Sequence, residues 1–308
     1  MQDETEPLPY EQRHVPFEDR PGVDVWPDGA RMAVVLYVTP EEWRWRRKEA
    51  LGVRGSRTLP EEPEPSLSTR SAVKYGFDVG LPRLQEILDD RDVKITLPTG
   101  AAAAKRHPEP IRSFHDAGHE INGHSYSEGT PPTTMTREQQ RDDIETSVEI
   151  LEDVTGDRPR GWLGPAVLSN QDTLDLLLEY GFEYHCDLQD DELPYFVDWD
   201  DRTLVEVPYR MVGNVNDFYL YAAREHRFSP TQALEYLEDT FDAYYRRAAT
   251  RPNLFIYGTH PFVSGRPDSS VVFEDFLDYV RGHDDVWLTT YGEIADYWRE
   301  EFGDGYPV

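Results

Sequence analysis

Short apolar runs that end at turn residues alternate with stretches of helical periodicity along most of this chain, and no other feature constrains its fold as much. The expected strands are 33–38, 93–97, 120–123, 160–163, 182–187, 204–208, 254–258 and 286–289. The expected helices are 78–91, 107–118, 136–155, 170–180, 230–249 and 271–283. Because strands separated by helices pair in parallel, the alternation predicts one α/β domain built as a parallel barrel. The strands 182–187 and 204–208 have no helix between them, so we expect irregular winding there.

The predicted barrel domain spans residues 23–302, and the segments before it and inside it differ in character. Residues 1–22 are acidic and contain proline without the basic-then-apolar order of a signal peptide, so we interpret them as an N-terminal extension. Residues 52–72 are long for a loop within a domain, and they are either a lid or a disordered acidic insertion. No run approaches the ~18 apolar residues that a membrane span needs. We therefore expect a cytoplasmic protein with no membrane partner.

The net charge of the chain limits the classes of partner that it can bind. There are 60 acidic residues against 31 basic ones, a formal net charge of −29, and only four of the basic residues are lysines. Such a surface repels itself unless salt screens it, so we expect a halophilic protein, with an acidic mesophilic protein as the alternative. The charge also disfavours nucleic acid, which leaves a small-molecule substrate as the expected partner and a homo-oligomer as an open question. The single cysteine, Cys186, excludes an intrachain disulfide and a thiolate metal cluster.

Polar residues collect where the predicted strands end, at the edge where the loops of a parallel barrel converge. The candidates there are Glu41 and Glu42 after 33–38, His124 after 120–123 with Glu128 four residues on, Trp162 on 160–163, Asn216 and Asp217 beyond 204–208, and His260 after 254–258 with Arg266 beyond it. Taken singly, each has a structural explanation: a histidine in a hydrogen bond, a solvated glutamate, a tryptophan in the core. Together, imidazoles that titrate near neutrality and desolvated carboxylates are the groups that move protons at a scissile bond.

Seven segments in order resemble the polysaccharide-deacetylase superfamily, and together they cover the chain from about residue 20 to 300. They are GVDVWPDGARMAVVLYV, IRSFHDAGHEINGHSYSEG, RPRGWLGP, YHCDLQDDELPY, VPYRMVGNVNDF, IYGTHPFVSGRP and VWLTTYGEIADYW. The last four look most like the metal-independent allantoinases of that superfamily. The resemblance implies an irregular, seven-stranded, TIM-like (β/α) barrel.

The chain departs from the metal-dependent members of the superfamily at the positions that matter for metal binding. Their aspartate base and aspartate ligand on the first strand correspond here to Tyr37 and Thr39. The second histidine of their His-x-x-x-His pair is Glu128, and the arginine after their Gly-aromatic pair is Leu163. Only His124 remains of the three ligands, so the resemblance implies a site without bound metal.

The resemblance further implies a hydrolase that acts on a non-peptide C–N bond in an amide, cyclic imide or ureide. His260 matches the superfamily's general acid, His124 would polarise the carbonyl or hold the oxyanion, and Glu41, or Glu128 in its place, would activate water. The expected substrate-binding residues are Glu42, Glu128, Trp162, Asn216, Asp217 and Arg266.

Two other functions stay open at this point. One is a non-catalytic ligand-binding barrel, because the base, a ligand and the arginine of the metal-dependent members are lost together. The other is a metal-dependent polysaccharide deacetylase with a rearranged site, in which a divalent metal binds His124 and Glu128 with Glu41 as a third ligand.

Overall fold

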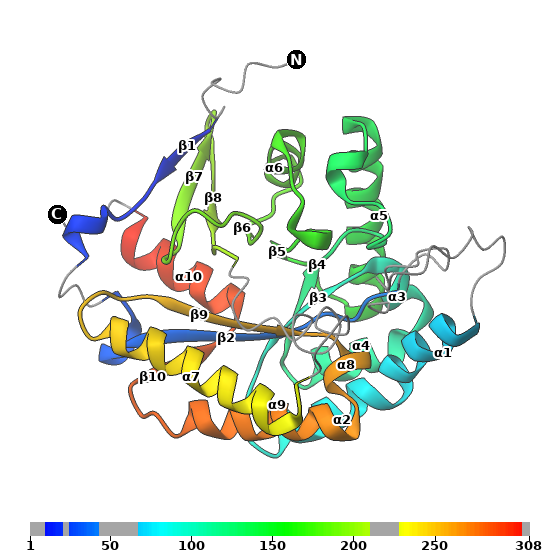
Figure 1. Ribbon diagram of the computed structural model, residues 1–308. Helices are drawn as coiled ribbons and strands as arrows, with labels where there is room; N and C mark the ends of the chain where they lie inside the picture. Colours follow the sequence, from blue (N-terminus) through cyan, green and yellow to red (C-terminus); the bar gives the residue numbers. More distant parts are fainter. Residues whose placement is uncertain (1–9, 21–24, 43–66, 210–227, 304–308) are drawn as a thin grey trace, which may run out of the picture.

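A ten-stranded sheet runs through the residues that this computed structural model describes, which are 10–20, 25–42, 67–209 and 228–303 (Figure 1). Its strands are β1 (Glu11–Arg13), β2 (Met32–Val38), β3 (Thr96–Thr99), β4 (Glu120–Gly123), β5 (Gly161–Trp162), β6 (Tyr184–His185), β7 (Tyr195–Trp199), β8 (Arg202–Glu206), β9 (Leu254–Thr259) and β10 (Val286–Thr289). The strand order is β1-β7-β8-β6-β5-β4-β3-β2-β10, and β9 also pairs with β2. Only the pairs β1–β7 and β7–β8 are antiparallel.

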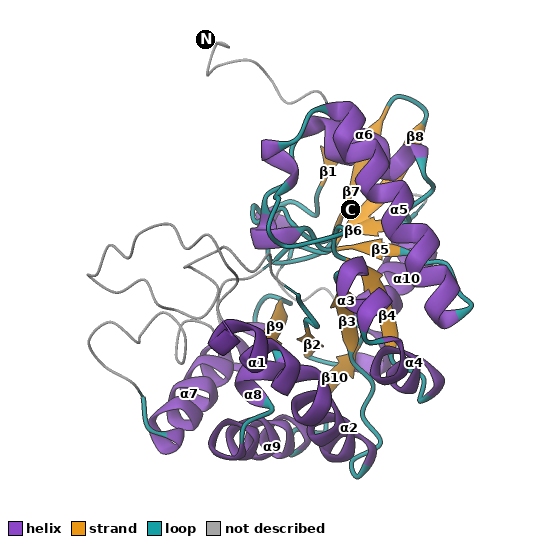
Figure 2. Cartoon of the chain, turned by 90° about the vertical axis from the view of Figure 1, so that its right-hand side faces the viewer, coloured by secondary structure: helices purple, strands orange, loops and turns teal. Residues whose placement is uncertain are grey.

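Helices surround this sheet (Figures 1 and 2). They are α1 (Leu67–Tyr75), α2 (Leu81–Asp89), α3 (Ala101–Arg106), α4 (Pro108–Asp116), α5 (Arg137–Thr155), α6 (Gln171–Glu179), α7 (Pro230–Ala248), α8 (Pro261–Ser264), α9 (Pro267–Arg281) and α10 (Tyr291–Phe302). A π-helical turn, η3 (Gly76–Gly80), joins α1 to α2. Capping boxes begin α5, α6, α7 and α10, because each N-cap side chain and the residue three positions later satisfy one another's backbone N–H groups. None of the described helices is long and apolar enough to cross a membrane.

Strand β2 is buried on both faces, which explains its uninterrupted apolar sequence. Met32, Val34 and Leu36 belong to the core between the sheet and the helices, together with residues of α2 and α9. The alternate residues Ala33 and Val35 belong to a second core on the other face, with residues of β6, β8 and α10. Burial on both faces is typical of a central strand in a barrel-like α/β fold.

The expectation of an α/β domain with a mostly parallel sheet and surrounding helices is confirmed. Details differ where local pattern was ambiguous. The strand expected at 93–97 forms only from Thr96, and the helix expected at 78–91 is preceded by α1 and η3. Strand β7 was not foreseen; it fills the region without a helix as an antiparallel hairpin with β8, turning at Asp200 with a φ of 54°.

Two expected segments are only partly described. Within 1–22, β1 pairs with β7, so residues 11–13 belong to the sheet. Within 52–72, residues 67–72 form the start of α1, and the remainder of the expected lid or insertion lies outside the described residues.

The turn η3 packs closely on α8. A Cβ atom on Gly80 would lie 2.2 Å from the Pro261 carbonyl oxygen, and one on Gly265 would lie 2.2 Å from the Gly80 Cα atom. Because real Cβ atoms do not approach so closely, only glycine allows the two backbones to meet. This contact joins the α1–α2 segment to the residues that directly follow β9.

Candidate active site

Glu41 lies between two histidines at the carboxyl ends of β2, β4 and β9. One carboxylate oxygen, Oε1, is 3.4 Å from His124 Nε2, and the other, Oε2, is 3.5 Å from His260 Nδ1. The three side chains are at most 10% exposed. Since β2 is hydrogen-bonded directly to β9 and reaches β4 through β3, the parallel register brings the three strand ends together. The result is a buried carboxylate with an imidazole on each side.

His124 is held in one orientation by the backbone. Its Nδ1 donates to the Leu163 carbonyl oxygen at the end of β5, and because a carbonyl can only accept, Nδ1 carries a proton. Nε2 is therefore the atom that faces Glu41. The next residue, Ser125, has a φ of 57°, a left-handed conformation that costs about 1 kcal/mol or more in a non-glycine residue. Strain of this kind is typical of functional sites.

A buried aspartate supports this strained turn. Asp143 on α5 accepts a hydrogen bond from the Tyr126 N–H, with an N–O distance of 3.1 Å. Burial raises the pKa of Asp143 to about 6, although the Tyr126 amide, Ser125 and His124 each lower it. Asp143 therefore links the 124–126 turn to the adjacent helix and titrates near neutrality.

His260 follows β9 and is oriented by two acceptors. Its Nδ1 is 3.4 Å from the Thr39 carbonyl oxygen as well as 3.5 Å from Glu41. Its ring stacks on Phe262 of α8, with centroids 5.4 Å apart. Two acceptors at Nδ1 favour the tautomer with the proton on that atom, and Glu41 thereby orients His260 as the carboxylate of a catalytic triad orients its histidine.

Glu128 is buried beside Glu41 without an ordinary hydrogen bond. Within the described part of the chain, neither of its carboxylate oxygens has a hydrogen-bond partner of normal geometry. Burial, and then the negative charge of Glu41, raise the pKa of Glu128 well above its usual value, and the backbone amides of Glu128 and Glu42 offset this only in part. A Cβ atom on Gly100 would lie 2.2 Å from Glu128 Oε1, so the glycine that precedes α3 leaves room for the carboxylate.

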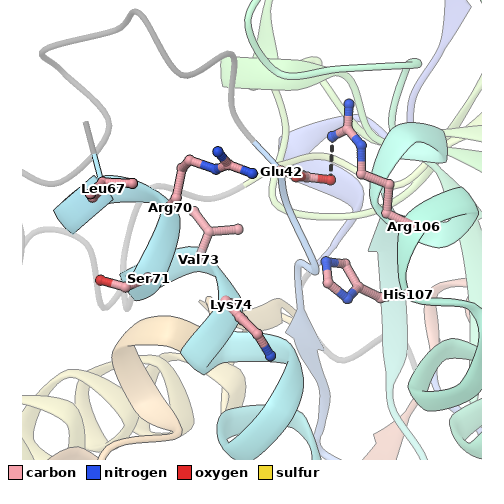
Figure 3. Close-up of a pocket in the computed structure, with 8 residues that line it drawn as sticks. All are labelled: Glu42, Leu67, Arg70, Ser71, Val73, Lys74, Arg106 and His107. Carbon is pink, nitrogen blue, oxygen red and sulfur yellow. Dashed lines mark ion pairs between the residues drawn. The ribbon is translucent and has the colours of Figure 1, made fainter. Parts of the chain in front are cut away.

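The other expected substrate-binding residues are not brought into this group. Trp162 is 1% exposed and packs against Phe182 in the core between α5 and α6, which is the environment of a structural core residue. Arg266 is exposed at the start of α9, where its guanidinium lies 4.8 Å from the Tyr75 ring centroid. Glu42 forms an ion pair with Arg106 at the end of α3, beside a cavity of about 630 Å³ (Figure 3). Asn216 and Asp217 lie outside the described residues.

A second histidine with two carboxylates, which the sequence did not reveal, lies within the sheet. His185 Nδ1 is 2.6 Å from Glu206, and its Nε2 is 3.3 Å from Asp187 and 3.0 Å from the Ser169 hydroxyl. Burial lowers the pKa of His185, but the two carboxylates outweigh burial and raise it to about 10. Asp187 also accepts from the Gly164 N–H at 2.7 Å. The spacing of His185 and Asp187, two residues apart on a strand, was the available signal that they share a face.

These residues do not make a conventional metal centre. Among the described residues, no three histidine, cysteine, aspartate or glutamate side chains are grouped so as to hold a metal ion. A catalytic zinc usually takes three protein ligands. His124 could offer Nε2 to a metal, because its Nδ1 donates to a backbone carbonyl as in many metal-bound histidines, but the described residues do not group two further ligands around it. Thr39 stands where the metal-dependent pattern requires a carboxylate. The residues present therefore do not fit the metal of the alternative rearranged site, in which His124 and Glu128 would be ligands.

Comparisons with known proteins agree with one another. Residues 69–185 match the family model described as polysaccharide deacetylase. The peptidoglycan deacetylase of Helicobacter pylori is 27% identical over 274 residues, which are 80% of this chain and 90% of that protein. The structure is similar to that of Puue allantoinase, with a TM-score of 0.80 and 29% identity over 92% of this chain and 96% of that one. It is also similar to a Mycobacterium smegmatis protein assigned as a polysaccharide deacetylase, with a TM-score of 0.78 and 30% identity over 94% and 96% of the two chains.

Proposed function

Because this chain belongs to the polysaccharide-deacetylase family, we propose that it hydrolyses a non-peptide C–N bond of an amide, cyclic imide or ureide with its own carboxylates and imidazoles. The observation that carries the proposal is the position of Glu41, which lies 3.4 Å from one buried histidine and 3.5 Å from another. A relative named allantoinase and one named peptidoglycan deacetylase support ureides and N-acyl groups as the first substrates to test.

Glu41 and Glu128 act as the general base in this proposal. Two carboxylates that repel one another in a buried site hold a proton between them more readily than either would alone, so the base is the pair rather than one residue. The pair takes a proton from water, whose oxygen then forms a bond to the substrate carbonyl carbon. A base with a raised pKa suits this step, because proton transfer is most efficient when the pKa lies near the working pH.

The histidines act on the other two atoms of the reacting group. With Nδ1 bonded to Leu163, His124 presents Nε2 to the site, and an N–H on this atom donates a hydrogen bond to the oxyanion. His260, with its proton on Nδ1, accepts at Nε2 the proton that the carboxylates took from water and gives it to the leaving nitrogen as the C–N bond breaks. The products are a carboxylic acid and the released N–H group, which is an amine, amide or urea according to the substrate.

The test is turnover of ureides, cyclic imides and N-acetyl sugars in molar potassium chloride, with and without EDTA. We expect one class to be hydrolysed equally in both conditions and Glu41→Gln to lower turnover by about 100-fold or more. Glu179→Gln, which changes an exposed carboxylate paired with Arg141, is the matched control.

Two results would contradict the proposal. Activity that EDTA abolishes and zinc restores would favour a metal-dependent deacetylase with a rearranged site. Saturable binding of a substrate without any turnover would favour a ligand-binding barrel.

A further inference from the structure

One peptide unit, between Leu163 and Gly164, connects the catalytic group to a buried aspartate. Its carbonyl oxygen, on Leu163, accepts the hydrogen bond from His124 Nδ1. Its N–H, on Gly164, donates to Asp187 Oδ1 at 2.7 Å. Because the atoms of a peptide unit lie in one plane and share their π electrons, the two hydrogen bonds are not independent of one another. His124 therefore lies at one end of a hydrogen-bonded chain and Asp187 at the other.

Asp187 is ionised although its side chain is only 1% exposed. Burial raises the pKa of Asp187, but the charge of His185 and the hydrogen bonds from His185, the Ser169 hydroxyl and the Gly164 N–H outweigh burial and lower it. His185 keeps its proton near pH 7, because its own pKa is raised to about 10. Hydrogen bonds to an ionised acceptor are roughly twice as strong as those between neutral groups. The Gly164 N–H is therefore firmly held by a buried negative charge.

The carboxylate reaches this peptide unit because residue 164 has no side chain. Gly164 has a φ of −74° and a ψ of 152°, angles that any residue adopts, so its backbone conformation does not require glycine. A Cβ atom here would lie 2.4 Å from Asp187 Oδ2, which is too close. The Ser169 hydroxyl donates to the same oxygen, Oδ2, while Gly164 donates to Oδ1. The space at Gly164 is thus what lets Asp187 bind the peptide N–H.

The charge of Asp187 acts on His124 by polarising the peptide unit. An anion at the N–H end increases the negative charge on the carbonyl oxygen at the other end, and hydrogen bonds in a buried chain strengthen one another by roughly 10–30% each. A stronger acceptor at Leu163 holds the proton on His124 Nδ1 and keeps Nε2 facing Glu41, 3.4 Å away. It also stabilises the ring when Nε2 carries a proton as well, which is the state in which His124 donates to the oxyanion.

We propose that Asp187 is a positioning residue for His124, and that it acts through the peptide unit between Leu163 and Gly164. This role rests on the hydrolytic function proposed above. Glu41 orients His260 by a direct contact between side chains, whereas a segment of backbone separates Asp187 from the imidazole that it orients. Both histidines of the catalytic group are then coupled to a carboxylate, one directly and the other through the backbone.

Steady-state kinetics of three variants test the proposal. Asp187→Asn keeps the shape of the side chain and removes its charge, whereas Gly164→Ala keeps the charge and displaces the carboxylate. Each should lower kcat by about tenfold or more with KM within about twofold, because His124 acts on the transition state. Glu206→Gln, the matched control, removes a carboxylate that bonds to the same His185 and to the Leu188 N–H, and should keep kcat within about twofold where circular dichroism shows it folded. Equal losses in all three variants overturn the positioning role.

Nuclear magnetic resonance of protein labelled with ¹⁵N-histidine separates this proposal from the hydrolytic one. The Nδ1 proton of His124, assigned by its absence in His124→Gln, should move upfield in Asp187→Asn and in Gly164→Ala, because its hydrogen bond weakens, but not in Glu206→Gln. That result supports the positioning role even if no substrate is hydrolysed. Hydrolysis together with a resonance that responds to neither Asp187→Asn nor Gly164→Ala overturns the role and leaves the hydrolytic function standing. Gly164→Ala leaves every buried charge in place, so it decides the question if Asp187→Asn does not fold.

Discussion

Two clusters in this molecule combine histidines with carboxylates, and they differ in how completely their hydrogen bonds are satisfied. Around His185, both ring nitrogens have close acceptors, at 2.6 Å to Glu206 and 3.0 Å to Ser169, and the side chain is fully buried. Around Glu41, the contacts to His124 and His260 are 3.4 and 3.5 Å, and Glu128 nearby lacks an ordinary hydrogen bond within the described residues. The first arrangement is complete in itself; the second leaves polar atoms that a substrate and water would satisfy.

This difference indicates that the His185 cluster contributes mainly to folding stability and the Glu41 cluster mainly to catalysis. A buried ion pair with every lone pair satisfied costs much to break, because removing one partner strands the other charge. A loosely satisfied cluster contributes less to folding, and its groups are available to a transition state. The two clusters also touch: Asp187 holds Gly164, and the neighbouring Leu163 carbonyl orients His124. The His185 cluster thus helps to hold the Leu163 backbone, and through it the ring of His124, in place.

The largest expected effect is on stability. Glu206→Gln removes one carboxylate from the fully buried His185 and should lower the free energy of unfolding by about 3–5 kcal/mol. Urea unfolding followed by circular dichroism measures it. The exposed change Glu183→Gln, which removes a partner of Arg160, should cost about 1 kcal/mol or less. Equal costs for the two variants would contradict the distinction.

His260→Asn should have the opposite profile. Turnover should fall by about 100-fold or more, while the free energy of unfolding changes little, because the contacts of this ring to Glu41 and Thr39 are long. Steady-state kinetics measure the turnover, and urea unfolding measures the free energy of unfolding. His124→Gln should follow the same direction with some loss of stability, since it breaks the bond to Leu163. A variant that melts without a selective loss of turnover would return these histidines to a structural role.

The pH dependence of stability should reveal the His185 cluster. The pKa of His185 is raised from 6.5 to about 10 in the folded protein. Between pH 6.5 and pH 10 the folded state therefore keeps a proton that the unfolded chain has lost. Its contribution to stability is therefore complete below about pH 6.5 and is lost as the pH rises through about 10, with a limiting slope of about 1.4 kcal/mol per pH unit. Unfolding curves of the wild type and of Glu206→Gln across this range test the sign. A stability difference that widens with rising pH would be incompatible with a charged His185.

Glu128→Gln should stabilise the protein modestly at alkaline pH. The pKa of Glu128 is raised, so the unfolded chain gives up this proton at a lower pH than the folded one, and stability falls as the pH rises through that interval. A neutral amide of the same size removes this loss. The unfolding midpoint of the variant should exceed that of the wild type by more in alkaline than in acidic buffer. The reverse trend would show that Glu128 is stabilised as an anion.

The smallest expected effect concerns salt. Raising potassium chloride to molar concentration should raise the melting temperature of the wild type, because it screens the net charge of −29. The difference in unfolding free energy between wild type and Glu206→Gln should change by no more than about 0.5 kcal/mol between low and molar salt, since salt screens buried pairs far less than exposed ones. A melting temperature that is flat or falls with salt would remove the case for salt adaptation.

Periodicity was enough to predict the parallel sheet, and chain order was enough to predict that residues after its strands converge. Glu41, His124 and His260 each follow a buried strand, so the register of β2, β4 and β9 brings them together. Trp162 also lies at such a position but its side chain points into the core, because neighbouring residues of a strand face opposite sides. Strand position alone does not tell which side a residue presents.

Other features depended on tertiary contacts that no local pattern contains. Glu206 and His185 are 21 residues apart, and only the pairing of β6 with β8 makes them neighbours. Helix α1 begins inside the segment 52–72 that was expected to be a lid or an insertion, and only the tertiary structure places it beside the end of α3. The hairpin of β7 with β8 was hidden because its turn, Asp200-Asp201, interrupts the apolar alternation.

The close contact of Gly80 with Pro261 and Gly265 has a consequence for how such an enzyme can diversify. It fixes the segment from α1 to α2 against the residues that follow His260, so these helices and the reacting residues keep their spacing while lying on different elements. Exposed positions of α1 can then be exchanged during evolution or in a mutant library without disturbing proton transfer. The two glycines are the exception, since any side chain there would push the elements apart. Exposed residues of α1 should therefore vary readily among related proteins, whereas this pair of backbone positions should resist replacement.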